Sequence, residues 1–214
     1  MKSTVVFGCG RFGSTVATTL SELGHEVLVV DADFDKVQGI SDQVTTAVQC
    51  DILDEDALTD LGLSNFDIAV IAIGSNLEAA IMATILCKEA GVTHIVAKAM
   101  SLRKGEILKK VGADKIIYPE RDMGFRLAHN LDSSNILDFI QLSPEYSIVE
   151  IKVLKEWSGK SIAELNFRYK YKATILGIER AGNIEVIPEA KEVLLADDVL
   201  IVLGKDNILK KLAK

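Results

Sequence analysis

The sequence lacks the features that would mark a nucleic-acid-binding, membrane-spanning or secreted protein. Its 24 lysines and arginines are outnumbered by 31 aspartates and glutamates, which gives a net charge of −7. This balance disfavours nucleic acid as the main partner. No apolar run approaches the roughly 18 residues that a membrane-spanning helix needs, and the start shows no signal-type segment with a cleavage site. Work at a membrane would therefore require another component to hold the chain there.

Cysteine is scarce, and its spacing is uninformative for metal binding or redox chemistry. Cys9, Cys50 and Cys87 lie far apart, and no CxxC pair occurs. Their surroundings are apolar or belong to a glycine-rich loop, so we expect reduced structural thiols. The sequence therefore predicts a cytosolic setting.

The residues needed for several common kinds of catalysis are also missing. His25 and His94 stand at the starts of expected strands, and His129 follows the last strand of the same region. None pairs with a carboxylate and a nucleophile in a way that would suit hydride transfer. No GxSxG motif and no GxxxxGK[ST] phosphate loop is present. We therefore expect a binding protein and not an enzyme.

What the sequence does contain is a regular alternation of short β-branched runs with helix-like segments. This pattern predicts a doubly wound parallel sheet of Rossmann type covered on both faces, which is an α/β fold. The expected strands are residues 3–8, 26–31, 45–50, 67–74, 94–98 and 115–119. The expected helix C-cap glycines are Gly24, Gly62, Gly91 and Gly112. A further helix runs from Pro119 to about Leu131, and the first domain is residues 1–131.

The remainder of the chain predicts a second, small β-rich α+β domain. Residues 132–144 are expected to form a linker or crossover, and residues 145–214 the second domain. Its strand-like runs are residues 146–153, 173–180, 184–187 and 198–204, followed by a short closing helix. "AGN" before Ile184 is typical of a hairpin turn.

A nucleotide fingerprint lies at the start of the first domain, in "VVFGCGRFGSTVA". Gly8, Gly10 and Gly13 form GxGxxG directly after a strand and at the start of a helix, and Asp31 ends the next strand. The glycines permit a tight turn and a close backbone approach to phosphate. Asp31 would accept hydrogen bonds from ribose and repel a 2′-phosphate. The combination predicts nucleotide binding.

Polar residues also follow the other expected strands, where ligands bind in open parallel sheets. Asp51, Asn76 and Ser101 also suit helix N-caps, and Asp33 with Lys36 also suits a solvent-facing helix start. Capping alone therefore remains an alternative explanation for these positions.

Lys98 and Glu120 need no such cap and are expected to face the crevice. Arg11 lies inside the phosphate loop, where a guanidinium can bind a terminal phosphate bidentately. ATP and ADP have such a phosphate and a nicotinamide dinucleotide does not; a solvent-facing arginine is the alternative. Glu120 would supply an oxygen ligand to a divalent cation at those phosphates.

These pieces together resemble the regulator-of-potassium-conductance family, and within it the cytosolic regulatory subunits of Ktr- and Trk-type potassium transporters. The resemblance covers both domains and the linker. The more specific pieces are "GRFG" and "YPERDMG"; others are "VQCDILDEDAL", "AVIAIGSNLEAAI", "VAKAMS" and "ILDFIQLSPEYSIVEIKV".

The resemblance implies a nucleotide site along the whole cleft. Arg11 would contact the terminal phosphates of ATP, within the loop Gly8, Gly10, Phe12 and Gly13, and Glu120 would bind a cation there. The implied ribose contacts are Asp31, Ala32 and Asp33. The implied adenine contacts are Asp51, Ile52, Ile73, Gly74 and Ser75, and the border residues are Lys98, Ala99, Met100 and Lys104.

The resemblance also implies partners. The segment after Glu120 would cross between subunits, and the resulting homodimers would assemble into a homo-octameric ring beneath an integral membrane potassium-transporting subunit. ATP and ADP would favour different ring shapes and so bias a pore gate. The chain would be cytoplasmic and peripheral to the inner face of the cell membrane.

Alternatives remain open for both domains. In some relatives the second domain resembles a sensor for cyclic di-AMP, for which Arg168, Lys172, Ile187 and Pro188 are candidates here; ordinary strand packing and surface charge explain them equally well. A small NAD-dependent oxidoreductase, with NAD(H) as cofactor, is the alternative function for the whole chain. A freestanding nucleotide sensor that acts on a soluble partner would share the same site.

Overall fold

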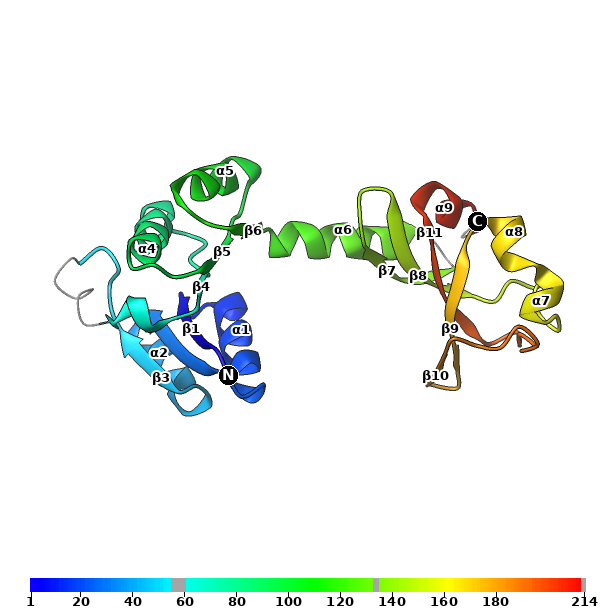
Figure 1. The fold of residues 1–214 in the computed structure, drawn as a ribbon, viewed down its shortest axis with the longest axis horizontal. Helices are drawn as coiled ribbons and strands as arrows, with labels where there is room; N and C mark the ends of the chain where they lie inside the picture. The colour runs from blue at the N-terminus through cyan, green and yellow to red at the C-terminus, as the bar shows by residue number, and fades with distance from the viewer. Residues whose placement is uncertain (55–60, 133–134, 213–214) are drawn as a thin grey trace. The chain divides into compact units, whose positions relative to one another are not determined.

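A parallel sheet organises the first of the two units into which the chain divides. The computed structural model describes residues 1–54, 61–132 and 135–212, and the units are Met1–Glu120 and Arg121–Lys214. In the first unit the strand order is β3-β2-β1-β4-β5-β6, with all pairs parallel (Figure 1). Its strands are β1 (Ser3–Phe7), β2 (Glu26–Asp31), β3 (Thr46–Gln49), β4 (Ile68–Ile71), β5 (His94–Lys98) and β6 (Lys115–Ile117). The Rossmann-type α/β prediction is confirmed.

Helices cover both faces of this sheet because its strands are apolar on both sides. Val5 and Phe7 of β1 pack into one buried cluster, whereas Val6 between them packs into another. The first cluster includes residues of α4 (Leu77–Glu89) and α5 (Leu102–Val111), and the second includes residues of α1 (Arg11–Glu22) and α2 (Phe34–Ile40). Short 3₁₀ turns are η1 (Ser41–Gln43) and η3 (Leu63–Asn65). Successive side chains of each strand point to opposite faces of the sheet, and both sets are apolar, so each face is covered by a layer of helices.

Glycines end three of these helices as expected. Gly24, Gly91 and Gly112 have φ angles of 83°, 83° and 128°, which lie in the region that side chains rarely adopt. Gly62 has a φ of 58°, but the helix that it was expected to end would occupy residues 55–60, which lie outside the described residues.

Helix α6 (Pro119–Asp132) begins at the end of the first unit and continues in the second. Pro119 occupies its first position, where the missing N–H costs no intrahelical hydrogen bond. The helix predicted up to about Leu131 is therefore confirmed. Among the described residues, no helix combines the length and the apolar character that crossing a membrane would require.

The second unit is built on an antiparallel sheet in the order β10-β9-β11-β8-β7. Its strands are β7 (Ile136–Gln141), β8 (Tyr146–Lys152), β9 (Thr174–Arg180), β10 (Asn183–Val186) and β11 (Val199–Lys205), and its last helix is α9 (Asp206–Leu212). Ala181 and Gly182 form the turn between β9 and β10 with positive φ angles. The β-rich prediction and the "AGN" hairpin are confirmed.

One segment differs from its expected role. Residues 132–144, expected to be a linker, contain β7, which pairs with β8 along its length. The physical reason is burial, because Ile136 and Phe139 are 7% and 5% exposed and belong to the core of the second unit. The pairing makes this stretch part of the second sheet.

Trp157 is the centre of the second unit's core. Its side chain is 0% exposed and packs edge-on against Phe167 and Tyr171. The indole Nε1 donates to the Tyr171 hydroxyl at 2.9 Å, and that hydroxyl donates to Glu156. Phe167 and Tyr171 both belong to the short helix α8 (Phe167–Tyr171), which follows the short helix α7 (Ile162–Leu165). Trp157 is thus a packing residue.

Candidate nucleotide-binding site

A cleft of about 320 Å³ lies at the carboxyl ends of β1, β2, β3 and β4. In a sheet of this strand order, the ends of β1 and β4 flank the point where the chain changes direction, and ligands bind there. Nine of the residues predicted from sequence line this cleft: Gly8, Gly10, Asp31, Ala32, Asp51, Ile52, Ile73, Gly74 and Ser75. The volume is within the range of small-molecule sites.

The glycine fingerprint places the phosphate loop against α1. Gly8 has a φ of 95°, and a Cβ at Gly13 would lie 1.9 Å from the Gly8 carbonyl oxygen. Only a residue without a side chain lets α1 pack this closely on the loop. Gly10 is the N-cap of α1 and supplies no side-chain cap. The start of α1 is therefore suited to an anion.

Asp31 is fixed at the end of β2 by backbone donors. Its Oδ2 accepts from the Cys9 N–H at 2.6 Å, and its Oδ1 accepts from the Asp33 N–H at 2.9 Å. The side chain is 14% exposed and lines the cleft. A carboxylate oxygen can accept more than one hydrogen bond, so Asp31 retains capacity for a hydroxyl of a ligand.

Asp33 and Lys36 form a second polar group beside Asp31. Asp33 caps α2 by accepting from the N–H groups of Asp35 and Lys36. Lys36 Nζ lies 3.1 Å from Asp33 Oδ2 and 3.9 Å from Asp31 Oδ1. The hydrogen bond with Lys36 lowers the pKa of Asp33, and the same contact raises the pKa of Lys36. Asp33 thus caps its helix, while Lys36 also lines the cleft.

Three further polar residues act as local caps or turns. Asn76 accepts from the Ala79 N–H and starts α4, and Ser101 accepts from the Lys104 N–H and starts α5. Asp51 accepts from the Leu53 N–H at 3.0 Å. The capping alternative therefore holds for Asn76 and Ser101, although Asn76 lines the cleft as well. Ile52 and Leu53 directly after Asp51 form a turn, and residues 55–60 lie outside the described residues.

A charged group lies beside the cleft on the β5 side. Lys98 Nζ is 2.6 Å from Glu120 Oε1 and 5.7 Å from the centre of the Phe12 ring. The Lys98 side chain is 12% exposed, whereas that of Glu120 is 61% exposed. A Cβ on Gly74 would lie 3.8 Å from the Lys98 Cε, which places the lysine stem against the cleft wall.

Electrostatics within this group favour the ionised carboxylate. The pKa of Glu120 is lowered, first by the hydrogen bond from Lys98 and also by the charge of Arg11. Arg11 is exposed on the first turn of α1. None of these three residues lines the cleft itself.

The remaining predicted residues do not line the cleft. Ala99 is buried, and Met100 is 60% exposed with its sulfur 3.4 Å from a Cβ placed on Gly74. Lys104 is half-buried on the first turn of α5. Phe12 and Gly13 belong to α1, where Phe12 packs into the core and contributes its ring to Lys98.

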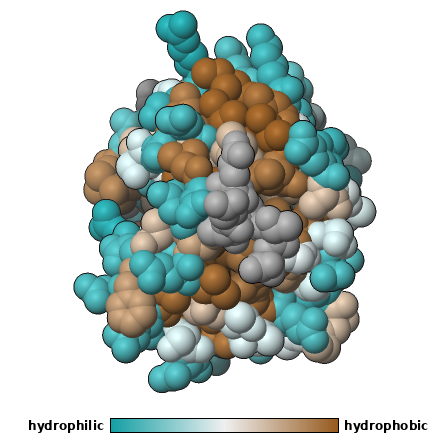
Figure 2. Space-filling view, turned by 90° about the vertical axis from the view of Figure 1, so that its left-hand side faces the viewer, coloured by the Kyte–Doolittle hydropathy of each residue, from teal (hydrophilic) through white to brown (hydrophobic). Residues whose placement is uncertain are grey.

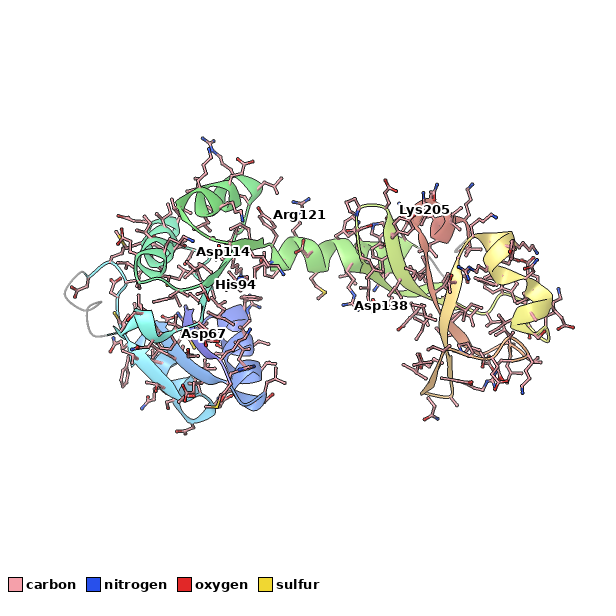
Figure 3. All side chains as sticks on the ribbon, in the orientation of Figure 1. Asp67, His94, Asp114, Arg121, Asp138 and Lys205 are labelled. Carbon is pink, nitrogen blue, oxygen red and sulfur yellow. The ribbon has the colours of Figure 1, made fainter. Side chains whose placement is uncertain are left out.

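The histidines lie away from the cleft. His94 starts β5, and its backbone lies beside Asp67 and Asp114 at the amino ends of the neighbouring strands (Figure 3). His25 precedes β2 and accepts from the Lys2 N–H. His129 stacks on Phe139 at 4.6 Å in the second unit. Their placement agrees with the sequence prediction.

Metal binding finds little support in the protein groups alone. Within residues 1–54, 61–132 and 135–212, no three or more His, Cys, Asp or Glu side chains gather as a metal site would require. Glu120 offers a single ionised carboxylate, which is one oxygen ligand of the six or more that a hard cation takes. Phosphate oxygens and water would have to supply the rest.

A second hollow, of about 520 Å³, lies on the β3 edge of the sheet. Its apolar lining includes Leu28, Val48, Leu61 and Phe66, and among the described lining residues only Glu26 is charged. Figure 2 shows the first unit from one side, with apolar surface between hydrophilic residues. Without a phosphate loop at this hollow, the cleft at the strand ends remains the candidate site.

The four residues considered for a cyclic dinucleotide lie on the surface of the second unit. Arg168 is exposed on α8, and Lys172 ends that helix with its Nζ 5.8 Å from the Tyr169 ring. Ile187 is 83% exposed with a φ of 58°, and Pro188 is half-buried.

Sequence reasoning missed several residues of the cleft. Cys50, Leu53 and Ala79 line it together with the buried residues Phe7, Val30 and Ala72. Lys36 and Asn76, which the sequence also assigned to a helix start and an N-cap, line it as well. A signal for Lys36 existed, because it stands three residues after the cap Asp33 on the first turn of a helix. The apolar residues of the cleft cannot be recognised from the local sequence, because apolar residues of the core occur in the same pattern.

The fold and the cleft place the chain in the class of two-domain proteins with a Rossmann-type nucleotide-binding unit. Residues 4–119 match the TrkA-N domain family, and residues 147–214 match the TrkA-C domain family. The chain belongs to the regulator-of-potassium-conductance family, in the group of Ktr-type potassium uptake proteins.

Individual relatives support this assignment. The chain is 42% identical over 213 residues to the Ktr system potassium uptake protein C of Bacillus subtilis, covering 100% of this chain and 96% of the relative. It is 39% identical over 210 residues to the Ktr system potassium uptake protein A of the same organism, covering 98% and 95%.

Solved structures agree on the fold. The GsuK RCK domain superposes with a TM-score of 0.66 at 21% identity, covering 99% of this chain and 47% of that one. A GsuK channel bound to NAD gives a TM-score of 0.65 at 20% identity, covering 97% and 38%.

Proposed function

We propose that the chain is a nucleotide-binding regulatory subunit through which ATP and ADP control a membrane potassium transporter. The observation that carries the proposal is the cleft at the ends of β1 to β4, with its glycine loop and Asp31, in a chain of the Ktr group. The relatives' names supply the process, potassium uptake. The cleft supplies the ligand class, a nucleotide with a ribose and a phosphate chain.

The proposed role is binding without turnover. Regulation by binding needs only a difference in affinity between two states of the protein. We propose that Asp31 holds the ribose, that the apolar wall with Ile52 and Ile73 holds the adenine, and that the start of α1 holds the phosphates. Arg11 would reach the terminal phosphate that distinguishes ATP from ADP.

The proposed assembly is a homo-octameric ring built from homodimers. The ring would lie on the cytoplasmic side of the membrane against an integral membrane potassium-transporting subunit. ATP and ADP would favour different ring shapes, since each would bind more tightly to the shape that suits its phosphate chain. Nothing beyond differential binding is needed to bias a gate.

A divalent cation at the phosphates is part of the proposal. Glu120 has a lowered pKa and carries its charge at neutral pH, so it can supply one oxygen ligand. The cation would have to compete with Lys98, whose ammonium lies 2.6 Å from that carboxylate. We expect Mg²⁺ to strengthen ATP binding to the wild type and to have less effect on Glu120→Gln.

The experiment that tests the function is calorimetry with ATP, ADP, NAD and NADH, combined with a mass measurement of the same samples. NAD and NADH are included because a channel of similar fold has been seen bound to NAD. We expect ATP and ADP to bind to a species of eight chains. Arg11→Ala should lower the ratio of ATP to ADP affinity. A preference for NAD(H) that ignores Arg11 would instead favour the oxidoreductase.

The ligand of the second unit is a separate prediction. Cyclic di-AMP would be expected to bind near Arg168, Lys172, Ile187 and Pro188, of which Ile187 is the most exposed apolar side chain. Calorimetry with cyclic di-AMP on the wild type and on Ile187→Ser tests it. Equal affinity of both proteins for cyclic di-AMP would show that Ile187 does not contribute to binding.

A further inference from the structure

We propose that Glu120 is an internal competitor of the nucleotide's phosphates for Lys98, and so a residue that sets nucleotide affinity at the phosphate end of the cleft. The inference rests on the proposed function, since it concerns the same site. A substitution of a nucleotide-binding residue lowers the affinity for the nucleotide. When no divalent cation is present, removing the charge of Glu120 should instead raise that affinity.

The Lys98 ammonium lies next to both the cleft wall and the first turn of α1. Its stem lies against the Gly74 wall of the cleft, and its Nζ lies over the Phe12 ring of the first turn of α1. β5 pairs with β4, whose carboxyl end flanks the cleft. Lys98 ends β5, so it lies on the same side of the sheet as the cleft, one strand farther along. A phosphate held at the start of α1 would therefore lie near the Lys98 ammonium.

The Lys98 side chain is largely buried. With 12% of its side chain exposed, Lys98 has lost most of its contact with water, and a charged group in that position requires a partner. The partner is the Glu120 carboxylate, at 2.6 Å. A phosphate of the ligand can serve the same ammonium only by sharing it or by displacing Glu120.

The pair is asymmetric in its exposure. Glu120 is 61% exposed, so it can return to water at low cost once the ammonium has another anion. Glu120 also adds a negative charge close to the place where the phosphates would lie, and Arg11 offsets it only in part. Both effects weaken phosphate binding, so removing the charge of Glu120 should strengthen it.

The consequence concerns specificity. Adenosine has no phosphate to compete with Glu120, whereas ADP and ATP do. Glu120 should therefore reduce affinity for phosphorylated nucleotides and leave the affinity for adenosine nearly unchanged. Glu120 thereby reduces the difference in affinity between adenosine and its phosphorylated forms, and it acts mainly through Lys98.

The test is calorimetry with ATP, ADP and adenosine in buffer that contains a chelator. The proteins are the wild type, Glu120→Gln, Lys98→Met and the double variant, with Asp122→Asn as a control that removes one carboxylate from the same helix. We expect Glu120→Gln to bind ATP and ADP about fivefold more tightly, and Lys98→Met about tenfold more weakly. In the Lys98→Met background, Glu120→Gln should give a clearly smaller gain, because only the direct charge repulsion remains, and Asp122→Asn should match the wild type.

Three outcomes overturn the inference while leaving the proposed function intact. ATP affinity that is unchanged or weaker in Glu120→Gln contradicts competition. An equal gain with and without Lys98 shows that the lysine does not mediate it, and an equal gain for adenosine shows that phosphate is not involved. A wild type that binds neither ATP nor ADP overturns the proposed function itself. If Lys98→Met does not fold, the sign of the Glu120→Gln effect and the adenosine comparison still decide.

Discussion

Two aspartates, one in each unit, show how differently a carboxylate next to a β-strand can be used. Asp31 ends β2, and its oxygens accept two backbone N–H groups while Lys36 lies at 3.9 Å. Asp198 precedes β11, and both its oxygens accept from the Arg180 guanidinium at 2.8 Å, with a third bond from the Leu195 N–H. Asp31 lines a cleft, whereas Asp198 is 2% exposed.

The difference teaches which carboxylate is available to a ligand. A buried charge with a bidentate arginine is saturated by its own chain, and it serves to hold the strands β9 and β11 to the loop between β10 and β11. A carboxylate fixed by backbone donors keeps its position and still has lone pairs facing the cleft. Four measurements can break or sharpen this contrast.

The largest effect is expected for Asp198→Ala. Removing the buried carboxylate leaves Arg180, whose side chain is 40% exposed, without its main acceptor, so the second unit should lose about 2 to 3 kcal/mol of unfolding free energy. Trp157 is the only tryptophan and is buried in that unit, so its fluorescence during urea unfolding reports this loss. The exposed neighbour Asp197→Ala is the matched control and should differ little from the wild type. Equal midpoints for both variants would contradict a structural role for Asp198.

The next effect is expected for Asp31→Ala, measured by calorimetry. Loss of hydrogen bonds from a ribose to a charged acceptor should weaken ATP and ADP binding about 30-fold, or about 2 kcal/mol. Because both nucleotides share the ribose, their affinity ratio should stay as in the wild type. Asp35→Ala, which alters an exposed carboxylate on the first turn of α2, should bind normally. A changed ratio would place the effect at the phosphates instead.

A third, smaller effect concerns acid. The hydrogen bond from Arg126 lowers the pKa of Asp138 to about 2, and the hydrogen bond from Arg180 lowers that of Asp198. A carboxyl whose pKa is lower in the folded state stabilises the fold above its unfolded pKa of 3.8, and this contribution is lost as pH falls toward 2. The second unit should therefore lose about 1 kcal/mol or more over that range.

The acid prediction is isolated by Asp138→Asn, which lacks the titrating group in β7 (Figure 3). Burial raises the pKa of Glu150 and works in the opposite direction in both proteins, whereas the smaller contribution of the Asp138 charge to that raised pKa is lost in the variant. The unfolding free energy of the second unit is followed by Trp157 fluorescence. Its difference between wild type and variant should be largest above pH 4 and should shrink toward pH 2. A constant difference would show that Asp138 does not titrate with the fold.

The smallest effect is expected for Lys36→Met. Its pair with Asp33 is half-exposed, so binding of ATP and ADP should weaken only about twofold to threefold. Added salt should reduce the difference from the wild type, because the contribution is a screened charge at the cleft wall. A difference that salt does not change would mean that Lys36 acts by contact.

The sequence predicted the first sheet well because its signals are local. Each strand is a short apolar run, and glycine or an N-cap residue marks most helix ends, as Asn76 and Ser101 do. β7 was missed because its burial depends on pairing with β8 across a turn. The helix α7 was missed although Ser161 and Glu164 form a capping box that the sequence displays as "SIAE".

The cleft was predictable in part for the same reason. Its glycines and Asp31 follow from spacing within one βαβ unit, whereas Lys98 and Glu120 stand 22 residues apart and meet only because β5 and β6 are neighbours. Lys98 was expected to face the crevice. Its pairing with Glu120 depends on strand order, which local pattern does not contain.

Gly13 has a consequence for how such a chain can evolve. A Cβ there would overlap the Gly8 carbonyl oxygen at 1.9 Å, and that oxygen belongs to the backbone, which has no side-chain rotation by which to move away. Every single-base change that alters a glycine codon to another amino acid introduces a Cβ. Descendants of this gene can therefore leave glycine at this position only together with a rearrangement of the phosphate loop.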